Sequence, residues 1–151
     1  MKLREMQAPR SPSLFDLTGR TALITGSSRG IGLSIARGLA QAGAHVIINS
    51  RGQAAVDEAV AQLKSEGLDA SGAAFDVADE ACVLQAFTAF DARGLAIDIL
   101  VNNAGIQHRQ PMLELGLADW QRVLDTNLTA AFLMGRETAR RMVARGLGGK
   151  V

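Results

Sequence analysis

The feature that most constrains this chain is a glycine-rich segment between a short apolar run and a helical pattern. It extends from Thr25 to Gly32, reads Thr-Gly-Ser-Ser-Arg-Gly-Ile-Gly, and directly follows the apolar run at 21–24. Gly26 and Gly30 can adopt backbone angles that a side chain forbids, and they let the main chain approach a ligand closely. A helix that begins here aims unpaired N–H groups and the positive end of its dipole at an anion. The segment therefore predicts a phosphate-binding turn between a strand and a helix.

The composition of this loop favours a ligand site over an ordinary glycine-rich connection. Its glycines are spaced G-x-x-x-G-x-G, which differs from the commonest dinucleotide fingerprint, G-x-G-x-x-G. Gly32 lies on the first helical turn, where the missing side chain allows the helix to pack tightly on the strand. Ser28, Arg29 and Ile31 complete the loop. We expect these residues to contact the ligand together with the glycines.

Apolar runs alternate with helical patterns along the chain. Strands are expected at 21–25, 44–49, 70–75 and 97–101, and helices at about 31–42, at 54–66, after an N-cap at Asp79, and at 118–145. Lys150 and Val151 resemble the start of a further strand. The alternation predicts an α/β fold, a doubly wound parallel sheet of the Rossmann type with about four strands and the start of a fifth. The apolar stripes, including Trp120, Leu128 and Phe132, are interpreted as core.

Length and composition limit the other classes of function. The chain has 151 residues, of which 48% are hydrophobic, and a net charge of +1. It suits one domain, expected over 15–151 after a flexible leader at 1–14, and its charge gives no argument for nucleic acid or a membrane surface. The single cysteine, Cys82, excludes an intrachain disulfide and a cysteine-based metal site, and fits a reducing cytoplasm. No apolar run approaches the ~20 residues that span a bilayer.

The end of the second expected strand indicates which nucleotide binds. Ligands of such sheets lie beyond the carboxyl ends of the strands, where an acidic residue would hold the ribose 2′-hydroxyl of NAD. Here that position reads Asn49-Ser50-Arg51, without an acid. With Arg29 nearby, a 2′-phosphate would meet two guanidinium groups and a hydroxyl, and charge-assisted hydrogen bonds are worth roughly 1.5–3 kcal/mol each. We therefore expect NADP, with NAD as the weaker ligand.

Four further polar positions each allow two interpretations. Asp76, at a strand end, either accepts a hydrogen bond from an adenine amino group or is a turn acid before the next helix. Asn103 bonds either the loop backbone or a ribose. Asn127 lies in an apolar helical pattern where Asn is a poor choice, so it is either a satisfied core amide or a disturbance of the helix that holds a water. His108 is either an acid–base group or polar surface.

Together these motifs resemble the short-chain dehydrogenase/reductase family over residues 15–151. The family's T-G-x-x-x-G-x-G motif matches the glycine loop, its D-V pair matches Asp76-Val77, its N-N-A-G motif matches 102–105, and its active-site asparagine matches Asn127. The resemblance implies a cytoplasmic homotetramer that acts on a small carbonyl or alcohol substrate, with Asn127 as a catalytic residue. The cofactor-binding residues expected from the loops and the resemblance are Gly26, Ser28, Arg29, Gly30, Ile31, Gly32, Ser50, Arg51, Asp76, Val77, Asn103, Ala104 and Gly105.

A narrower resemblance is to the gluconate 5-dehydrogenases. It is carried by 14–19, by the glycine loop, and by Gly105-Ile106-Gln107 with Pro111 nearby. This resemblance implies NADP-linked interconversion of gluconate and 5-ketogluconate. The 3-oxoacyl carrier-protein reductases share most of these features, so reduction of an acyl substrate is the alternative.

The chain departs from the family in its catalytic residues. The family uses a serine and a Tyr-x-x-x-Lys helix, whereas this chain contains no tyrosine, and its lysines are Lys2, Lys64 and Lys150. The resemblance implies that the catalytic serine, tyrosine and lysine lie beyond Val151. We therefore expect the chain to be the incomplete N-terminal part of a longer enzyme. The alternative is a natural short form that binds nucleotide or partners without catalysis.

Overall fold

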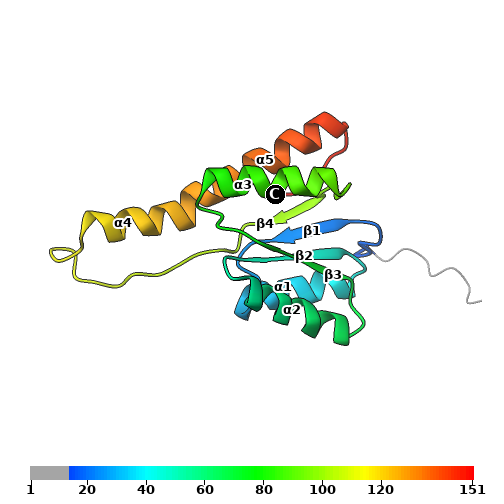
Figure 1. Ribbon diagram of the computed structural model, residues 1–151, viewed down its shortest axis with the longest axis horizontal. Helices are drawn as coiled ribbons and strands as arrows, with labels where there is room; N and C mark the ends of the chain where they lie inside the picture. Colours follow the sequence, from blue (N-terminus) through cyan, green and yellow to red (C-terminus); the bar gives the residue numbers. More distant parts are fainter. Residues whose placement is uncertain (1–13) are drawn as a thin grey trace, which may run out of the picture.

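The computed structural model describes residues 14–151, so the leader expected at 1–14 lies outside the described residues apart from Leu14. Four parallel strands form one sheet in the order β3-β2-β1-β4 (Figure 1). The strands are β1 (Thr21–Ile24), β2 (His45–Ser50), β3 (Ala70–Ala74) and β4 (Ile99–Val101). Lys150 pairs in parallel with Ile99. The expected start of a fifth strand is thus present beside β4.

Helices cover both faces of this sheet (Figure 1). One layer consists of α1 (Gly30–Gln41) and α2 (Gln53–Ser65), and the other contains α3 (Glu80–Ala92) and α5 (Ala130–Arg145). Side chains of a strand alternate between its two faces, so the apolar run of β2 fills both layers. Val46 and Ile48 belong to the core under α1 and α2, while Ile47 belongs to the core under α3 and α5. The predicted doubly wound parallel α/β fold is confirmed.

Local sequence signals explain how α1 packs on the sheet and ends, and where α3 begins. In α1 the buried positions are Gly32, Ala36 and Ala40, and these small residues bring the helix close to the sheet. The helix ends before Gly43, whose φ of +100° favours glycine. Asp79 caps α3 as predicted, because its Oδ1 accepts a hydrogen bond of 2.9 Å from the Cys82 N–H, which lowers the pKa of the Asp79 carboxyl.

The region over 118–145, which was predicted to be one continuous α-helix, is not a regular α-helix throughout. It consists of α4 (Leu117–Leu124), a π-helical turn η1 (Asp125–Thr129) and α5. The prediction that its apolar stripe is core is wrong for Trp120, Leu128 and Phe132, which are 52%, 65% and 60% exposed, whereas Val123, Leu124 and Ala131 are half-buried. For Trp120 the physical reason is that α4 extends past the sheet (Figure 1), so this part of the stripe has no described layer beneath it. Among residues 14–151, no helix has both the length and the apolar character that a membrane crossing requires.

Candidate functional site

A cleft of about 470 Å³ lies where the strands end. Every residue that the sequence predicted to bind the cofactor lines this cleft, although these residues come from four separate loops. The strand order reverses between β1 and β4, and in open α/β sheets ligands bind in the crevice at that point. The volume is within the ~300–1,000 Å³ of ordinary ligand pockets. The topology and the loops therefore define one candidate ligand site.

The glycine loop packs directly on the turn that follows β4. Gly26 has a φ of +62°, and a Cβ on it would lie 2.8 Å from the Cα of Ala104. A Cβ on Gly32 would lie 2.5 Å from Asn103 Nδ2 and 2.6 Å from the Gly26 carbonyl oxygen. No side chain caps the first turn of α1, which begins at Gly30, so its N–H groups are available to an anion. These contacts explain why glycine is required here.

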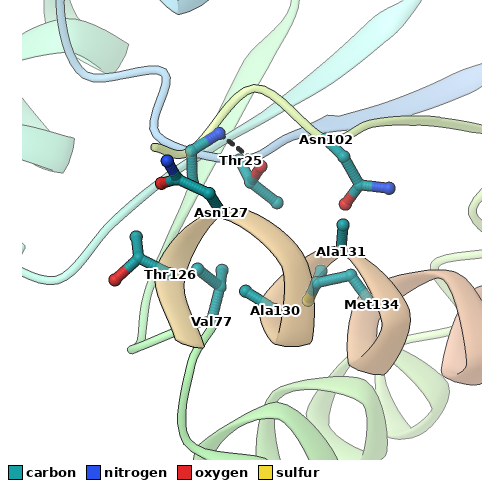
Figure 2. A pocket seen from close by; sticks show the side chains of 9 residues that line it. Thr25, Val77, Asn102, Thr126, Asn127, Ala130, Ala131 and Met134 are labelled. Atoms are coloured by element: carbon teal, nitrogen blue, oxygen red, sulfur yellow. Dashed lines mark hydrogen bonds between the residues drawn. The ribbon is translucent and has the colours of Figure 1, made fainter. Parts of the chain in front are cut away.

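Thr25 and Asn103 lock the two loops together. Thr25 Oγ1 accepts hydrogen bonds from the N–H groups of Asn103 at 3.0 Å and Ala104 at 2.9 Å. Figure 2 shows Thr25 with the second of these bonds as a dashed line. In the other direction, Asn103 Nδ2 donates to the carbonyl oxygens of Thr25 at 2.9 Å and Gly26 at 3.1 Å. Of the two interpretations of Asn103, the structure has it bonding the loop backbone. These hydrogen bonds between the two loops fix the floor of the cleft.

The rim of the cleft beside β2 carries positive charge. Arg29 and Arg51 both line the cleft, and within residues 14–151 neither guanidinium forms an ion pair. Ser50 Oγ donates to the Gly52 carbonyl oxygen at 3.2 Å, which holds the turn after β2. Among the lining residues that the structure describes, Asp76 is the only acid, and its Oδ1 accepts from the Ala78 N–H at 2.9 Å, as a turn acid does. The rim can thus receive an anion at Arg29 and Arg51.

Asn127 interrupts the last helical region and holds the chain that leaves β4. Its Oδ1 accepts from the Ile106 N–H at 2.8 Å, and its Nδ2 donates to the Ile106 carbonyl oxygen at 3.0 Å. Of the two predicted alternatives, the core amide is wrong in its placement, because Asn127 is exposed, although its amide is hydrogen-bonded. The disturbance of the helix is present, because the helix widens into η1. A cavity of about 20 Å³ adjoins Asn127 and Thr25 (Figure 2), and it is large enough for one water. Single π-helical turns are frequent at functional sites.

Several lining residues were missed by sequence reasoning. They are Asn49, Phe75, Ile106, Arg122 and Thr126. Asn49, Phe75 and Ile106 directly adjoin the predicted loops, so extending each loop by one residue would have found them. Arg122 and Thr126 come from α4 and η1, and no local pattern indicates that they reach the cleft. His108 does not line it. In the part of the chain that the structure describes, no group of three or more His, Cys, Asp or Glu side chains is placed to hold a metal ion.

The sheet order, the glycine loop and the cleft at the strand ends define a Rossmann-type α/β domain. The chain belongs to the short chain dehydrogenase family, whose model matches residues 20–151.

Three proteins illustrate the similarity. Gluconate 5-dehydrogenase of Gluconobacter oxydans is 47% identical over 137 residues, covering 91% of this chain and 54% of the relative. The crystal structure of a gluconate 5-dehydrogenase from Burkholderia cenocepacia, in complex with NADP and tartrate, is 48% identical with a TM-score of 0.85, covering 90% of this chain and 53% of that one. A 3-oxoacyl-[acyl-carrier-protein] reductase of Aquifex aeolicus is 39% identical, covering 87% of this chain and 54% of the relative. The chain spans about half the length of the curated relatives it matches.

Proposed function

We propose that this chain, over residues 15–151, is the NADP-binding part of an oxidoreductase that interconverts gluconate and 5-ketogluconate. The observation that carries the proposal is the cleft itself, in which the start of α1 adjoins the guanidinium groups of Arg29 and Arg51, and within residues 14–151 neither the helix start nor these groups have a side-chain partner. The NADP bound in the Burkholderia cenocepacia structure supports the choice of cofactor, and the names of the two gluconate 5-dehydrogenases support the choice of substrate.

Each part of the cleft has a proposed role toward NADP. The N–H groups at the start of α1 bind the pyrophosphate, and the glycines allow its close approach. Arg29 and Arg51, with the Ser50 hydroxyl, bind the 2′-phosphate, while Asp76 and Val77 border the adenine. When bound, NADP exchanges a hydride with the substrate carbon.

The remaining proposed roles concern the substrate side of the cleft. Asn103, Ala104 and Gly105 form the wall between the glycine loop and the substrate. Asn127 acts on catalysis by positioning the main chain of Ile106, which it bonds through both amide atoms. The family's tyrosine, which is the general acid/base, and its serine and lysine, which orient the substrate and support the tyrosine, belong to a proposed C-terminal remainder.

Turnover by the full-length protein tests the proposed substrate. We expect NADPH oxidation with 5-ketogluconate and NADP reduction with gluconate, followed at the nicotinamide absorbance. The similarity to the Aquifex aeolicus enzyme favours a second candidate, an acyl carrier-protein reductase. Activity on acetoacetyl thioesters without activity on either sugar acid would replace the first proposal with the second. Binding of NADPH without turnover of any of these substrates would indicate a nucleotide-binding protein that performs no chemistry.

We further propose that the full-length protein is a cytoplasmic homotetramer. The exposed apolar residues of α4, η1 and α5, namely Trp120, Leu128 and Phe132, support self-association, because such patches usually mark interaction sites. Cys82, a half-buried free thiol, is compatible with a reducing compartment.

Phe132→Asp is expected to dissociate the tetramer, because the new carboxylate would be buried against an apolar partner surface. Light scattering after size-exclusion chromatography gives the mass of the variant. The control is Leu84→Asp, which places the same charge on the exposed side of α3 and leaves the mass unchanged. A tetramer that persists in Phe132→Asp would contradict an interface at this position.

A further inference from the structure

We propose that Asn49 is a positioning residue that sets the affinity of the cleft for the part shared by NADP and NAD. The inference rests on the proposed function, since it assigns a role within the same site. Asn49 lies near the end of β2, is 1% exposed, and lines the cleft. Nothing in the role of the 2′-phosphate requires a buried amide at this position, so its contacts need a separate explanation.

The Asn49 side chain joins the segments that follow the two neighbouring strands. Its Oδ1 accepts a hydrogen bond from the Gly26 N–H at 3.3 Å, on the β1 side. Its Nδ2 donates to the carbonyl oxygens of Ala73 at 3.1 Å and Phe75 at 3.2 Å, on the β3 side. One buried amide therefore bridges the glycine loop and the end of β3.

The Asn49 main chain strengthens the same connection through Ser27. Asn49 N–H donates to Ser27 Oγ at 3.0 Å, and Ser27 N–H donates to the Asn49 carbonyl oxygen at 2.8 Å. Ser27 Oγ in turn donates to the Ile24 carbonyl oxygen at 2.7 Å, and Ser27 is fully buried. The glycine loop is thus held to β2 by a closed set of hydrogen bonds in which no member faces solvent.

Each segment that Asn49 joins has its own proposed contact with the cofactor. Gly26 opens the loop for the pyrophosphate, and Phe75 directly precedes Asp76 on the adenine side. The pyrophosphate and the adenine are both present in NADP and in NAD. Disturbing Asn49 should therefore weaken both cofactors alike, whereas a residue that contacts the 2′-phosphate affects NADP alone.

Asparagine is required by the pattern of donors and acceptors. An aspartate of the same shape keeps the acceptor for Gly26 but has no N–H for the carbonyl oxygens of Ala73 and Phe75. It would also place a buried negative charge against those oxygens, which is strongly unfavourable. The Asn49→Asp variant therefore tests the amide specifically.

The experiment measures the Kd of NADP and of NAD by calorimetry on full-length wild-type and Asn49→Asp protein. We expect both Kd values to rise by roughly tenfold or more, and the Kd of NADP to rise further than that of NAD, because the new carboxylate lies near the proposed 2′-phosphate position. The control is Gln62→Glu, an amide-to-acid change on the exposed side of α2, which leaves both Kd values unchanged. A second variant, Asn49→Ser, removes both N–H donors without introducing charge, and we expect it to raise both Kd values alike, with their ratio unchanged within about twofold.

The outcomes separate this inference from the proposed function. Unchanged affinities in Asn49→Ser, or a loss confined to NADP, would overturn the inference while leaving the proposed function intact. Wild-type protein that binds neither cofactor would overturn both. A purely structural role would lower the melting temperature but leave the Kd of the folded protein unchanged, so thermal unfolding is recorded for each variant. If Asn49→Asp does not fold, Asn49→Ser decides the question.

Discussion

Gly32→Ala in the full-length protein is expected to lower the free energy of unfolding by about 1–3 kcal/mol and to weaken NADP binding at least tenfold. The new Cβ would lie 2.5 Å from Asn103 Nδ2, 2.6 Å from the Gly26 carbonyl oxygen and 2.8 Å from Ser27 Cα. Two of these three atoms belong to the backbone of the glycine loop, so the clash cannot be relieved by rotating a side chain. Asn103 must also leave the carbonyl oxygens that it holds. Urea unfolding and NADP titration give the two quantities.

Gly38→Ala on the same helix is the matched control. A Cβ at Gly38 meets nothing within 4 Å, and this exposed position has ordinary helical backbone angles. Because alanine restricts the unfolded chain more than glycine does, we expect Gly38→Ala to stabilise the protein by roughly 0.5–1 kcal/mol without changing the NADP affinity. If Gly32→Ala matched this control in both measurements, the result would contradict the close packing of the glycine loop on the turn after β4.

Arg51→Asp is expected to reverse the preference between the two cofactors. The substitution removes a guanidinium at the cleft rim that has no ion-pair partner within residues 14–151, and places a carboxylate where the 2′-phosphate would lie. Charge-assisted hydrogen bonds contribute roughly 1.5–3 kcal/mol each, so the Kd of NADP should rise by about a hundredfold or more. The same carboxylate can accept hydrogen bonds from the ribose hydroxyls of NAD, whose Kd should fall or stay constant.

The control for charge is Arg93→Asp. Arg93 follows α3 and does not line the cleft, and replacing it by aspartate changes the net charge by the same amount as Arg51→Asp. It should leave the ratio of the two Kd values unchanged. A ratio that is also unchanged in Arg51→Asp would show that this guanidinium does not contact the 2′-phosphate.

The sequence predicted those parts of the site that depend on local rules. The glycine loop is identifiable because positive φ angles and close backbone approach both require glycine, and the structure places such angles at Gly26 and Gly30. The disturbance at Asn127 is also predictable, because an amide in an apolar helical pattern seeks partners outside the helix. Those partners, the main-chain atoms of Ile106, lie 21 residues away in the sequence.

What the sequence did not predict depends on contacts between distant segments. Periodicity places Trp120, Leu128 and Phe132 on one stripe, but it carries no information about whether another layer covers that stripe. Asn49 has no local signal either, because its partners are a loop 23 residues before it and a strand end 26 residues after it. Such bridging becomes visible only when the register of β1, β2 and β3 is known.

The most direct measurement is a crystal structure of the full-length protein with NADP bound. We expect the pyrophosphate against the N–H groups of 30–32, the 2′-phosphate between the guanidinium groups of Arg29 and Arg51, and the adenine beside Asp76. A cofactor that lies outside this cleft, or one whose 2′-phosphate touches neither arginine, would contradict this expectation.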